Sequence, residues 1–505
     1  MNKSIKRIFA LILCVAMLLA VAGCGSNDAI STPTRKLLEG ESEIDGDDVP
    51  SSGFRVGYGR TDIMPDDSIP LGSYGNAMQR FSTGYLNKIF FSCIAITDDS
   101  DKTMLLMSWD FTQCKDDYLK EFRQYAKNKY GIDENYVHLS GTHTHSSGDL
   151  GLASSVKSVQ DHSVKVYQRA HEAIDMAMAD RKAAEMYAGE TKTDGLNFVR
   201  NYYRADGTTA GDNWGYIYSS PVVSHVKDPD ETMRIIKFTR KNSDGEKVKD
   251  VVLVNWQAHN HMTGGSDKTD LAADFSGAFR TSLEKERDCY MTFFQGCAGN
   301  LNEKDTYFPE NNKTEDYREY GKLLADTALK IYDKLEKYST EAGIKSETKE
   351  FEGEVNHTFD GMYDKAVEVM QEYNNSGKQR SAILDLCRQY NMPGCNAQAS
   401  CIIKYYTTDK TKKFLVNAYQ IGEIGWTSAG VEFFDVLGER IRKGSPYKLT
   451  FTQGYTDQST QGYLPYADAY DYGCYEVCNS PFNKGVGEQC ADFLIEMLKE
   501  LKSSK

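Results

Sequence analysis

The sequence predicts a mixed α/β fold in which β-sheets are flanked by helices. Short apolar runs of strand length alternate with segments of helical periodicity along most of the chain. The run 104–109 has the length of a strand, and apolar residues then recur at helical spacing over 116–130 before a capping Gly131. No long linker interrupts this alternation after residue 53. We therefore expect one mature domain over residues 53–505.

The remaining elements are assigned by the same two patterns. Short continuous apolar runs predict strands, and apolar residues spaced three or four positions apart predict helices. Strands are expected at 136–140, 251–256, 290–294, 414–426 and 449–452. Helices are expected at 276–287, 316–335, 361–391, 432–442 and 487–501. The chain shows no internal repeat and no low-complexity segment in its core.

Residues 1–23 have the pattern of a lipoprotein signal peptide. A basic start precedes an apolar run at 8–21, and small residues then precede Cys24. The apolar run is about fourteen residues long, whereas a membrane-spanning helix needs about 20. This difference argues against the alternative of an uncleaved anchor helix. We expect cleavage before Cys24, a diacylglycerol on its thiol, and an extracytoplasmic protein anchored to the cell membrane.

Composition limits what the mature chain binds. Residues 24–52 are polar and acidic without an apolar pattern, which predicts a disordered tether. The formal net charge is −14 with no concentrated basic segment, so a nucleic-acid partner is not expected. Two of the 12 cysteines, Cys14 and Cys24, belong to the signal and the lipid site. The other cysteines are in a compartment that permits disulfides, but their spacing does not determine the pairing. No cysteine pair has zinc-knuckle spacing.

Two pairs of histidines follow predicted strands. His143 and His145 come after the strand 136–140, and His259 and His261 come after the strand 251–256. Side chains at i and i+2 of an extended segment point to the same side. Imidazole is a common metal ligand and the usual acid–base group near neutral pH. A polar loop would explain either pair alone, but two such pairs among only 9 histidines favour a metal or proton-transfer site.

Two further strand ends carry groups that suit such a site. The small residues of 295–302 allow close approach of the backbone to a ligand, although a tight structural turn explains them equally well. Glu432 follows the run 414–426 at the predicted start of a helix. A carboxylate there usually complements the helix dipole. Beside two histidine pairs, it completes a set of zinc-ligand types.

Several motifs resemble the neutral (non-lysosomal) ceramidase family. They include RVGYGRTDI at 55–63, SGTHTHS at 140–146, NFVR at 197–200 and GVEFF at 430–434. Further matching segments are 70–75, 255–259, 273–277, 438–442, 462–466 and 475–476. The resemblance spans about residues 53–488 with the order preserved, which is more specific than any single motif. It implies the mixed α/β catalytic domain of that family, here without its C-terminal immunoglobulin-like domain.

The resemblance also implies a set of site residues. Matched position by position, the zinc ligands of the family fall on His143, His259, Glu432 and Tyr466, and its polar substrate contacts fall on His145, Arg200 and Tyr475. Zn²⁺ is then the expected cofactor, because it lowers the pKa of a bound water. His145 is expected to carry the proton, and Arg200 and Tyr475 to hold the scissile carbonyl.

The sequence departs from the family at one reacting position. Asn302 stands where the family has its proposed serine nucleophile, so no acyl-enzyme is expected there, and Asn302 would at most polarise the carbonyl. The segment 346–407 also has no counterpart that we can match.

The resulting prediction is a zinc-dependent amidohydrolase acting on ceramide or a related N-acyl compound by metal-activated water. One alternative is a zinc hydrolase of the same fold acting on another amide or ester, such as a cell-wall or glycan conjugate. A second is a non-catalytic ligand-binding lipoprotein. Loss of the serine favours the non-catalytic alternative, whereas the retained ligands favour an enzyme. The expected partners are a small-molecule or lipid substrate and, through Cys24, the membrane; no obligate protein partner is evident.

Overall fold

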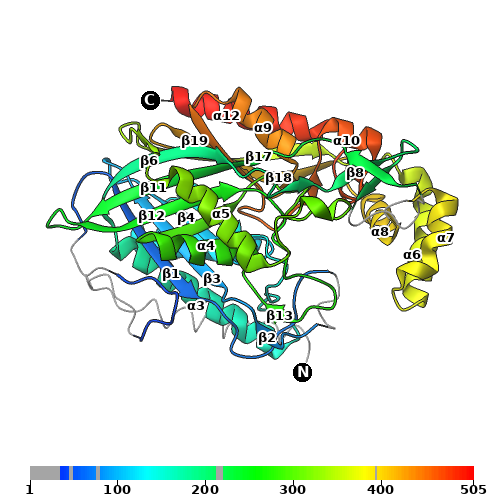
Figure 1. Cartoon of the computed structure of the whole chain (residues 1–505), viewed down its shortest axis with the longest axis horizontal. Helices are drawn as coiled ribbons and strands as arrows, with labels where there is room; N and C mark the ends of the chain where they lie inside the picture. The colour runs from blue at the N-terminus through cyan, green and yellow to red at the C-terminus, as the bar shows by residue number, and fades with distance from the viewer. Residues whose placement is uncertain (1–34, 45–48, 75–79, 212–219, 393–394, 505) are drawn as a thin grey trace.

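The computed structural model describes residues 35–44, 49–74, 80–211, 220–392 and 395–504. Within these residues the chain forms four layers: helices, a nine-stranded sheet, a four-stranded sheet and a second layer of helices (Figure 1). The predicted mixed α/β fold with flanking helices is confirmed. The predicted signal segment 1–23 and the lipid site Cys24 lie outside the described residues. Among the helices that are described, none combines the length and apolar character needed to cross a membrane.

The larger sheet curls until its two edges meet. Its strands run in the order β14 (Cys289–Gln295), β12 (Lys247–Trp256), β11 (Thr232–Lys241), β6 (Lys182–Lys192), β1 (Arg55–Asp62), β3 (Phe90–Thr97), β4 (Thr103–Trp109) and β5 (Val137–Gly141), with β16 (Glu336–Tyr338) beside β6. The pairs β12–β14 and β4–β5 are parallel. The edge strand β14 contacts β4 and β5, and the Ser108 hydroxyl donates to the Phe293 carbonyl oxygen at 2.8 Å. The carboxyl ends of β5 and β12 are thereby brought together.

Helices cover the outer face of this sheet. They are α2 (Asp116–Tyr130), α3 (Lys157–Ala179), α4 (Asp274–Glu286) and α5 (Tyr317–Tyr332). Helix α3 lies directly on β1, since a Cβ at Gly57 would be 2.0 Å from the Ala177 carbonyl oxygen and one at Gly59 would be 1.9 Å from that of Ala173. Only glycine permits this approach of helix to strand.

The second sheet packs on the inner face of the first. It contains β17 (Ile344–Glu354), β18 (Thr411–Ile421), β19 (Ile424–Ala429) and β21 (Leu449–Gln453). Trp426 fills the space between the sheets, with its ring 4.6 Å from that of Phe451 and 5.6 Å from that of Phe294. The opposite face of the second sheet is covered by α9 (Asp435–Gly444) and α12 (Val486–Ser503). Burial of such large apolar side chains on both faces stabilises the layered arrangement.

Short elements complete the chain. The strands are β2 (Gly84–Tyr85), β7 (Phe198–Val199), β8 (Asn201–Arg204), β9 (Thr209–Gly211), β10 (Val222–His225), β13 (Asp270–Leu271), β15 (Leu301–Asn302), β20 (Glu432–Phe433) and β22 (Tyr463–Leu464). The short helices are η2 (Glu134–Tyr136), η3 (Pro309–Asn311), η4 (Asp360–Met362), α10 (Ala467–Tyr472) and α11 (Tyr475–Cys478). Several of them pair beside the ends of β5 and β12, where the candidate site lies.

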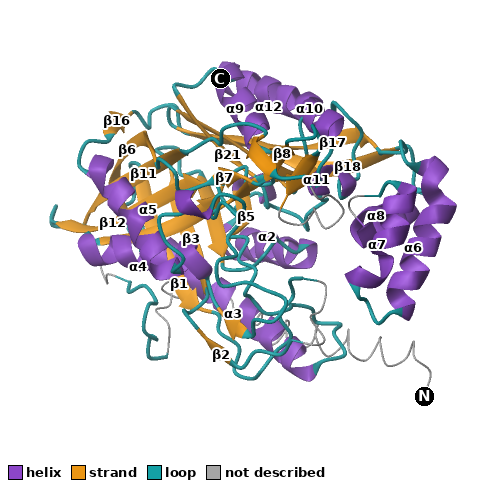
Figure 2. Ribbon diagram, turned by 45° about the vertical axis from the view of Figure 1, so that its right-hand side comes forward, coloured by secondary structure: helices purple, strands orange, loops and turns teal. Residues whose placement is uncertain are grey.

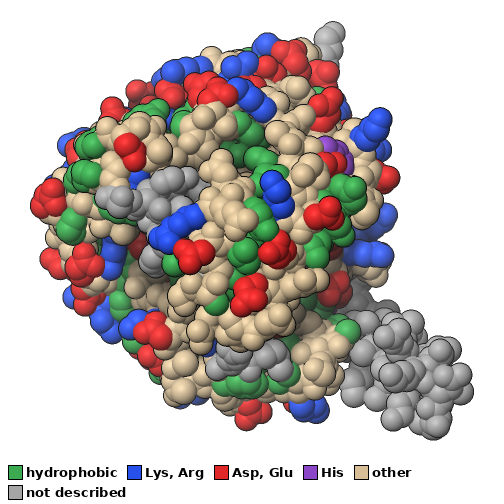
Figure 3. All heavy atoms as spheres, turned by 90° about the vertical axis from the view of Figure 1, so that its right-hand side faces the viewer, with side chains coloured by type: hydrophobic (Ala, Val, Ile, Leu, Met, Phe, Trp, Pro, Cys, Tyr) green, Lys and Arg blue, Asp and Glu red, His purple; other side chains and the backbone are tan. Residues whose placement is uncertain are grey.

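Three helices form a lobe at one side of the layered body. Helices α6 (Tyr363–Asn375), α7 (Arg380–Tyr390) and α8 (Cys395–Tyr405) are inserted between β17 and β18 and share a small apolar core (Figure 2). They account for most of the segment 346–407 that matches no family motif. On the face of the molecule that carries this lobe, basic and acidic side chains are interspersed (Figure 3). Neither sign of charge predominates on this face.

Three element predictions were wrong in their boundaries. The predicted helix 361–391 is divided into α6 and α7. The segment 414–426 is a hairpin of β18 and β19 rather than one strand, because the chain turns at Gly422 with a φ of 55°. Glu432 begins β20, and the helix predicted to include it starts only at Asp435. By contrast, the helix predicted over 116–130 is α2 and ends at Gly131 in the left-handed conformation.

The tether prediction fails for residues 35–44. The backbone N–H of Ser42 donates to the Arg60 carbonyl oxygen at 3.1 Å, and the Arg60 N–H donates to the Ser42 hydroxyl at 2.8 Å. The buried Glu41 carboxylate accepts hydrogen bonds from Arg35 and from the backbone N–H of Asp62. These polar groups form specific bonds with β1, which low apolar content alone does not reveal.

Several cysteines are thiols in the described part of the chain. They include Cys297, Cys401, Cys474 and Cys490. These four cysteines form no disulfide here, although their sequence spacing left the pairing open. Burial raises the pKa of the Cys297 thiol to about 11, so this side chain is protonated and unreactive near neutral pH.

Candidate metal centre

The loops after β5 and β12 lie against each other. The backbone N–H of His145 donates to the Asn260 carbonyl oxygen at 3.0 Å, and the Asn260 side-chain amide donates to the Thr142 carbonyl oxygen at 3.3 Å. His143 has a φ of 62°, a left-handed conformation that costs a non-glycine residue energy. Such strain is often found at functional sites. These contacts bring His143 and His259 to one point.

Three potential metal donors converge there. The Nε2 atoms of His143 and His259 lie 3.7 Å and 3.6 Å from Glu432 Oε2, and the two imidazole rings are 4.7 Å apart between centroids. Zinc binds histidine nitrogen and carboxylate oxygen at about 2.0–2.2 Å in tetrahedral geometry. Tetrahedral ligands at that bond length are about 3.3–3.6 Å apart. The observed spacing therefore fits a single zinc ion with little adjustment.

Backbone carbonyl groups orient both imidazole rings. His143 Nδ1 donates to the Thr112 carbonyl oxygen at 2.7 Å, and His259 Nδ1 donates to that of Ala298 at 2.9 Å. A carbonyl oxygen only accepts, so Nδ1 carries the proton in each ring and the Nε2 lone pair is available to a metal. Burial lowers the pKa of His143 to about 3 and that of His259 well below its usual value, so both rings are neutral.

The Glu432 carboxyl also fits a cation. Burial raises its pKa to about 7, although Arg200 and the Tyr455 hydroxyl oppose the shift. The carboxylate form is thus costly in this position unless a positive charge lies close to it. A divalent ion between His143, His259 and Glu432 would supply that charge.

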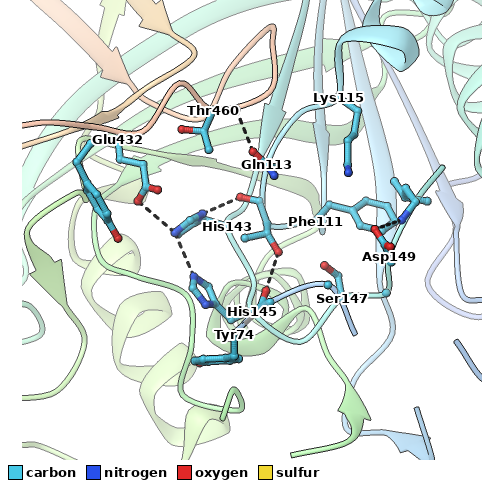
Figure 4. Close-up of a pocket in the computed structure, with 16 residues that line it drawn as sticks. Tyr74, Phe111, Gln113, Lys115, His143, His145, Ser147, Asp149, Glu432 and Thr460 are labelled. Atoms are coloured by element: carbon cyan, nitrogen blue, oxygen red, sulfur yellow. Dashed lines mark hydrogen bonds and ion pairs between the residues drawn. The ribbon is translucent and has the colours of Figure 1, made fainter. Parts of the chain in front are cut away.

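His145 belongs to a second possible donor set. One donor atom each from His143, His145 and His259 lies within 4.8 Å of the others. However, His145 Nδ1 is buried without a hydrogen-bond partner in the described structure, and its Nε2 is 3.2 Å from His143 Nε2. A metal-bound imidazole usually has its second nitrogen oriented by an acceptor. His145 is also partly exposed in the cavity (Figure 4), which suits a proton carrier better than a ligand.

The structure does not bring Tyr466 to the centre. Its ring packs 6.0 Å from Phe434 and 6.3 Å from Tyr472 in a separate aromatic cluster. Parallel pairing of β20 with β22 places Tyr463, rather than Tyr466, opposite Glu432. Helix α10 then starts at residue 467 and directs the chain away.

Two other tyrosines contact the metal-centre residues. The Tyr455 hydroxyl donates to Glu432 Oε2 at 3.3 Å, and the Tyr455 ring lies 4.1 Å from that of His143. The Tyr463 hydroxyl accepts from Arg200 Nη2 at 3.1 Å. Sequence reasoning missed both, since several tyrosines occur within a few residues and the motif alone did not fix the register. Only the strand pairing of Glu432 with Tyr463 shows which tyrosine of the segment 463–466 lies beside the metal centre.

Arg200 is held in a buried polar network. Its Nε donates to Glu476 Oε1 at 2.6 Å, its Nη2 to the Gly299 carbonyl oxygen at 3.0 Å, and its Nη1 to Asn302 Oδ1 at 3.3 Å. Asn302 is placed by the pairing of β15 with β7. The ring of Tyr475 lies 6.0 Å from that of Tyr463 at the edge of this network. Glu476, which neutralises Arg200, was not identified from the sequence.

His261 is separated from its neighbour His259. Its Nδ1 lies 2.9 Å from Glu303 Oε1, and its ring centroid is 5.5 Å from that of His259. Burial alone would lower the pKa of His261, but the Glu303 carboxylate outweighs burial and raises it. His261 is therefore engaged by a carboxylate, whereas His259 faces Glu432.

A cavity of about 230 Å³ lies beside the donor atoms. His143, His145 and Glu432 line it on the side of the metal centre (Figure 4). Tyr463 is also a lining residue. The other lining residues combine apolar and charged groups, including Tyr74, Phe111, Lys115, Asp149, Leu150 and Thr460. This lining suits a ligand that carries both polar and apolar groups.

Comparison with known proteins identifies the fold. No family profile and no curated protein sequence matches the chain. The crystal structure of neutral ceramidase from Pseudomonas aeruginosa matches with a TM-score of 0.63 and 14% sequence identity, over 90% of this chain and 75% of that one. The chain has the neutral ceramidase fold. A structure of a ceramidase complexed with C2 matches similarly, with a TM-score of 0.64 and 14% identity over 90% of this chain and 76% of that one.

Within the neutral ceramidase fold, the predicted site residues fall into three groups. His143, His145, His259 and Glu432 converge beside the cavity, which all of them except His259 line. Arg200, Asn302 and Tyr475 are connected around Tyr463 next to it. Tyr466 lies apart. At 14% identity the likeness establishes the fold alone.

Proposed function

We propose that this protein is a zinc-dependent hydrolase that cleaves the amide bond of ceramide or a related N-acyl compound. The observation that carries the proposal is the convergence of His143, His259 and Glu432, two neutral imidazoles and one carboxylate, beside a cavity. Two nitrogen donors and a carboxylate are a ligand set of catalytic zinc sites, which keep a position open for water or substrate. The neutral ceramidase fold supports the substrate class.

A Zn²⁺ bound to these residues would act as a Lewis acid and lower the pKa of a bound water. His145 is the side chain that moves the proton, because its Nε2 lies 3.2 Å from His143 Nε2 and its ring lines the cavity. As a neutral imidazole it accepts a proton and then donates it to the leaving amine.

Arg200 and Asn302 act on the carbonyl side of the reaction. Arg200 donates to Asn302 Oδ1, which fixes the orientation of the amide. Oriented in this way, the amide is suited to donate a hydrogen bond to an oxyanion. An asparagine amide is a poor nucleophile, so hydrolysis through Asn302 would proceed without an acyl group on that residue.

The anchored location is a further part of the proposal. The basic start, the apolar run 8–21 and the small residues before Cys24 support export and lipid attachment at Cys24. Attachment to a membrane would place the enzyme beside a lipid substrate. A Cys24→Ala variant is expected to be recovered in the soluble fraction of cells, whereas the unchanged protein is recovered with membranes.

The activity is tested with purified protein and a short-chain ceramide. Zinc-loaded protein should release fatty acid, chelator-treated protein should not, and added Zn²⁺ should restore release. The Glu432→Gln variant is the control for the metal centre. Zinc retention without cleavage of ceramide or of any other N-acyl compound would favour the ligand-binding lipoprotein instead. Cleavage that continues in the chelated protein would contradict the metal mechanism.

A further inference from the structure

A second group of catalytic side-chain types lies where the two sheets meet. His138 Nε2 is 3.0 Å from the Ser346 hydroxyl, and His138 Nδ1 is 2.8 Å from Asp457 Oδ2. His138 belongs to β5, Ser346 to the edge strand β17, and Asp457 to the segment after β21. A hydroxyl within hydrogen-bond reach of an imidazole that a carboxylate orients is the arrangement of a serine nucleophile and its base.

The carboxylate fixes which nitrogen of His138 carries the proton. Asp457 accepts the Leu139 backbone N–H through Oδ1 at 2.7 Å, which leaves Oδ2 facing His138 Nδ1. An ionised carboxylate only accepts, so Nδ1 is the protonated nitrogen and Nε2 is the acceptor for the Ser346 hydroxyl. The Tyr419 ring lies flat on the imidazole at 4.5 Å and 16°, which limits its rotation.

The three side chains of this group differ in their exposure to solvent. The side chains of Asp457 and His138 are 1% and 5% exposed, whereas Ser346 is only partly buried. Within the described residues, the Ser346 hydroxyl makes no hydrogen bond other than the one to His138. Of the three residues, Ser346 is therefore the least buried, and its base is shielded.

A cavity of about 370 Å³ borders the Asp457 end of the group. Arg123 and Gln458 also line it, and each has a buried side-chain nitrogen without a hydrogen-bond partner in the described structure. Arg123 Nη2 is 3.7 Å from Asp457 Oδ2. Neither His138 nor Ser346 lines this cavity, so it lies at the carboxylate end of the group and not at the hydroxyl.

This group is separate from the candidate metal centre. His138 is near the start of β5, whereas His143 follows the end of that strand. None of the residues that line the cavity beside the metal centre is Ser346, His138 or Asp457. A reaction at Ser346 therefore needs no ligand of the metal centre.

We propose that Ser346, His138 and Asp457 form a second, metal-independent site that reacts with small esters or other activated acyl donors. The Ser346 oxygen bonds to the acyl carbon as its proton passes to His138 Nε2, and that proton then goes to the departing alcohol. Water afterwards loses its proton to His138 Nε2, attacks the acyl carbon and releases the acid, while the proton returns to Ser346. The proposal does not depend on the zinc-dependent activity.

The full chain treated with a fluorophosphonate probe tests this site. One covalent adduct on Ser346 is expected by intact mass and peptide mapping, and it should be absent in Ser346→Ala. Ser224→Ala removes an exposed strand serine as a matched control and should label like the unchanged protein. Labelling should continue in the presence of a metal chelator. Its loss on chelation would place the reaction at the metal centre and overturn the proposal.

The Asp457→Asn variant tests the role of the base rather than the fold. An asparagine amide would donate to His138 Nδ1 and move the imidazole proton to Nε2, so labelling should slow by about 10²–10⁴-fold in protein with an unchanged melting temperature. Labelling of the unchanged protein is decisive even if a variant fails to fold. No adduct on Ser346, or an equal rate in folded Asp457→Asn, would show that His138 only bridges β5 and β17.

Discussion

The candidate metal centre has two sides, called here the histidine wall and the opposite wall, and they are built in different ways. On the histidine wall, His143 and His259 are fixed by backbone carbonyl groups at 2.7 Å and 2.9 Å. On the opposite wall, the Tyr455 hydroxyl holds Glu432, and Arg200 is held by the Glu476 carboxylate together with one backbone carbonyl, that of Gly299. Backbone partners depend on the fold, whereas side-chain partners are lost with a single substitution.

This difference assigns a separate task to each wall. The histidine wall presents oriented lone pairs and should determine whether a metal binds. The opposite wall contains a buried ion pair and hydroxyl groups, so it should determine charge and substrate position. Apart from Glu432, which is itself one of the three donors, substitutions on the two walls should therefore affect different measurements.

The largest effect is expected on the histidine wall. His259→Ala removes one oriented donor, so zinc content should fall from about one ion per chain to nearly none. His261→Ala should retain zinc, because His261 is paired with Glu303. Elemental analysis of the two purified variants makes the measurement. Zinc loss in His261→Ala alone would reverse the assignment of the two histidines.

The next effect concerns the ion pair of the opposite wall. Glu476→Leu leaves Arg200 buried without its carboxylate, which should lower the free energy of unfolding by about 3–5 kcal/mol. Asp492→Ala is the control, because the Arg440–Asp492 pair is exposed and should contribute less than about 1 kcal/mol. Urea unfolding curves measure both. Similar losses in the two variants would show that the buried pair has no special role.

Asn302 tests the carbonyl side of the reaction. Asn302→Ala removes one amide donor and should lower kcat by about 10²–10³-fold without abolishing it. Asn302→Asp is a matched variant that keeps the size but not the amide donor. Steady-state rates with a short-chain ceramide give the effect, and peptide mapping during turnover should find no acyl group on residue 302. An adduct on that residue in the unchanged protein would contradict direct attack by water.

The raised pKa of Glu432 gives a pH dependence to the metal-free protein. Its pKa is about 7 in the folded state against 4.5 for an ordinary glutamate, so the folded state favours the neutral carboxyl. This preference stabilises the folded state fully below pH 4.5. The free energy of unfolding then falls by about 3 kcal/mol as the pH rises to about 7. Urea unfolding of chelator-treated protein and of Glu432→Gln measures it. Glu432→Gln should lack this pH-dependent contribution to the free energy of unfolding. Identical pH profiles for the variant and the unchanged protein would contradict the prediction.

The smallest effect distinguishes two tyrosines. Tyr463→Phe removes a hydroxyl that accepts from Arg200, so kcat/KM should fall by about tenfold, the effect of losing one hydrogen bond to a charged group. Tyr466→Phe should have little effect, since Tyr466 lies in a separate cluster. The same ceramide assay compares both. A larger loss for Tyr466→Phe would favour Tyr466 as the metal ligand, as the family motif implied.

The histidine wall was the more predictable of the two. His143 and His259 follow apolar strands, and the ends of such strands can be recognised from the sequence alone. Tyr463 and Glu476 lie in a segment of short elements with many polar residues, where periodicity does not fix the register. Their positions depend on the pairing of β20 with β22.

The fold class was predictable for the same reason, but the sheet closure was not. Alternating apolar runs indicated strands and helices, as at α2. The contact of β14 with β4 and β5 joins residues far apart in the chain, and no local pattern encodes it. This closure is what brings the two histidine loops together.

The most direct test of the central claim is the position of the metal in a crystal of the zinc-loaded protein. An anomalous difference map at the zinc absorption edge should show one peak about 2.0–2.2 Å from His143 Nε2, His259 Nε2 and Glu432 Oε2. A peak coordinated by His145 in place of Glu432, or no peak near these residues in protein that contains zinc, would contradict the account.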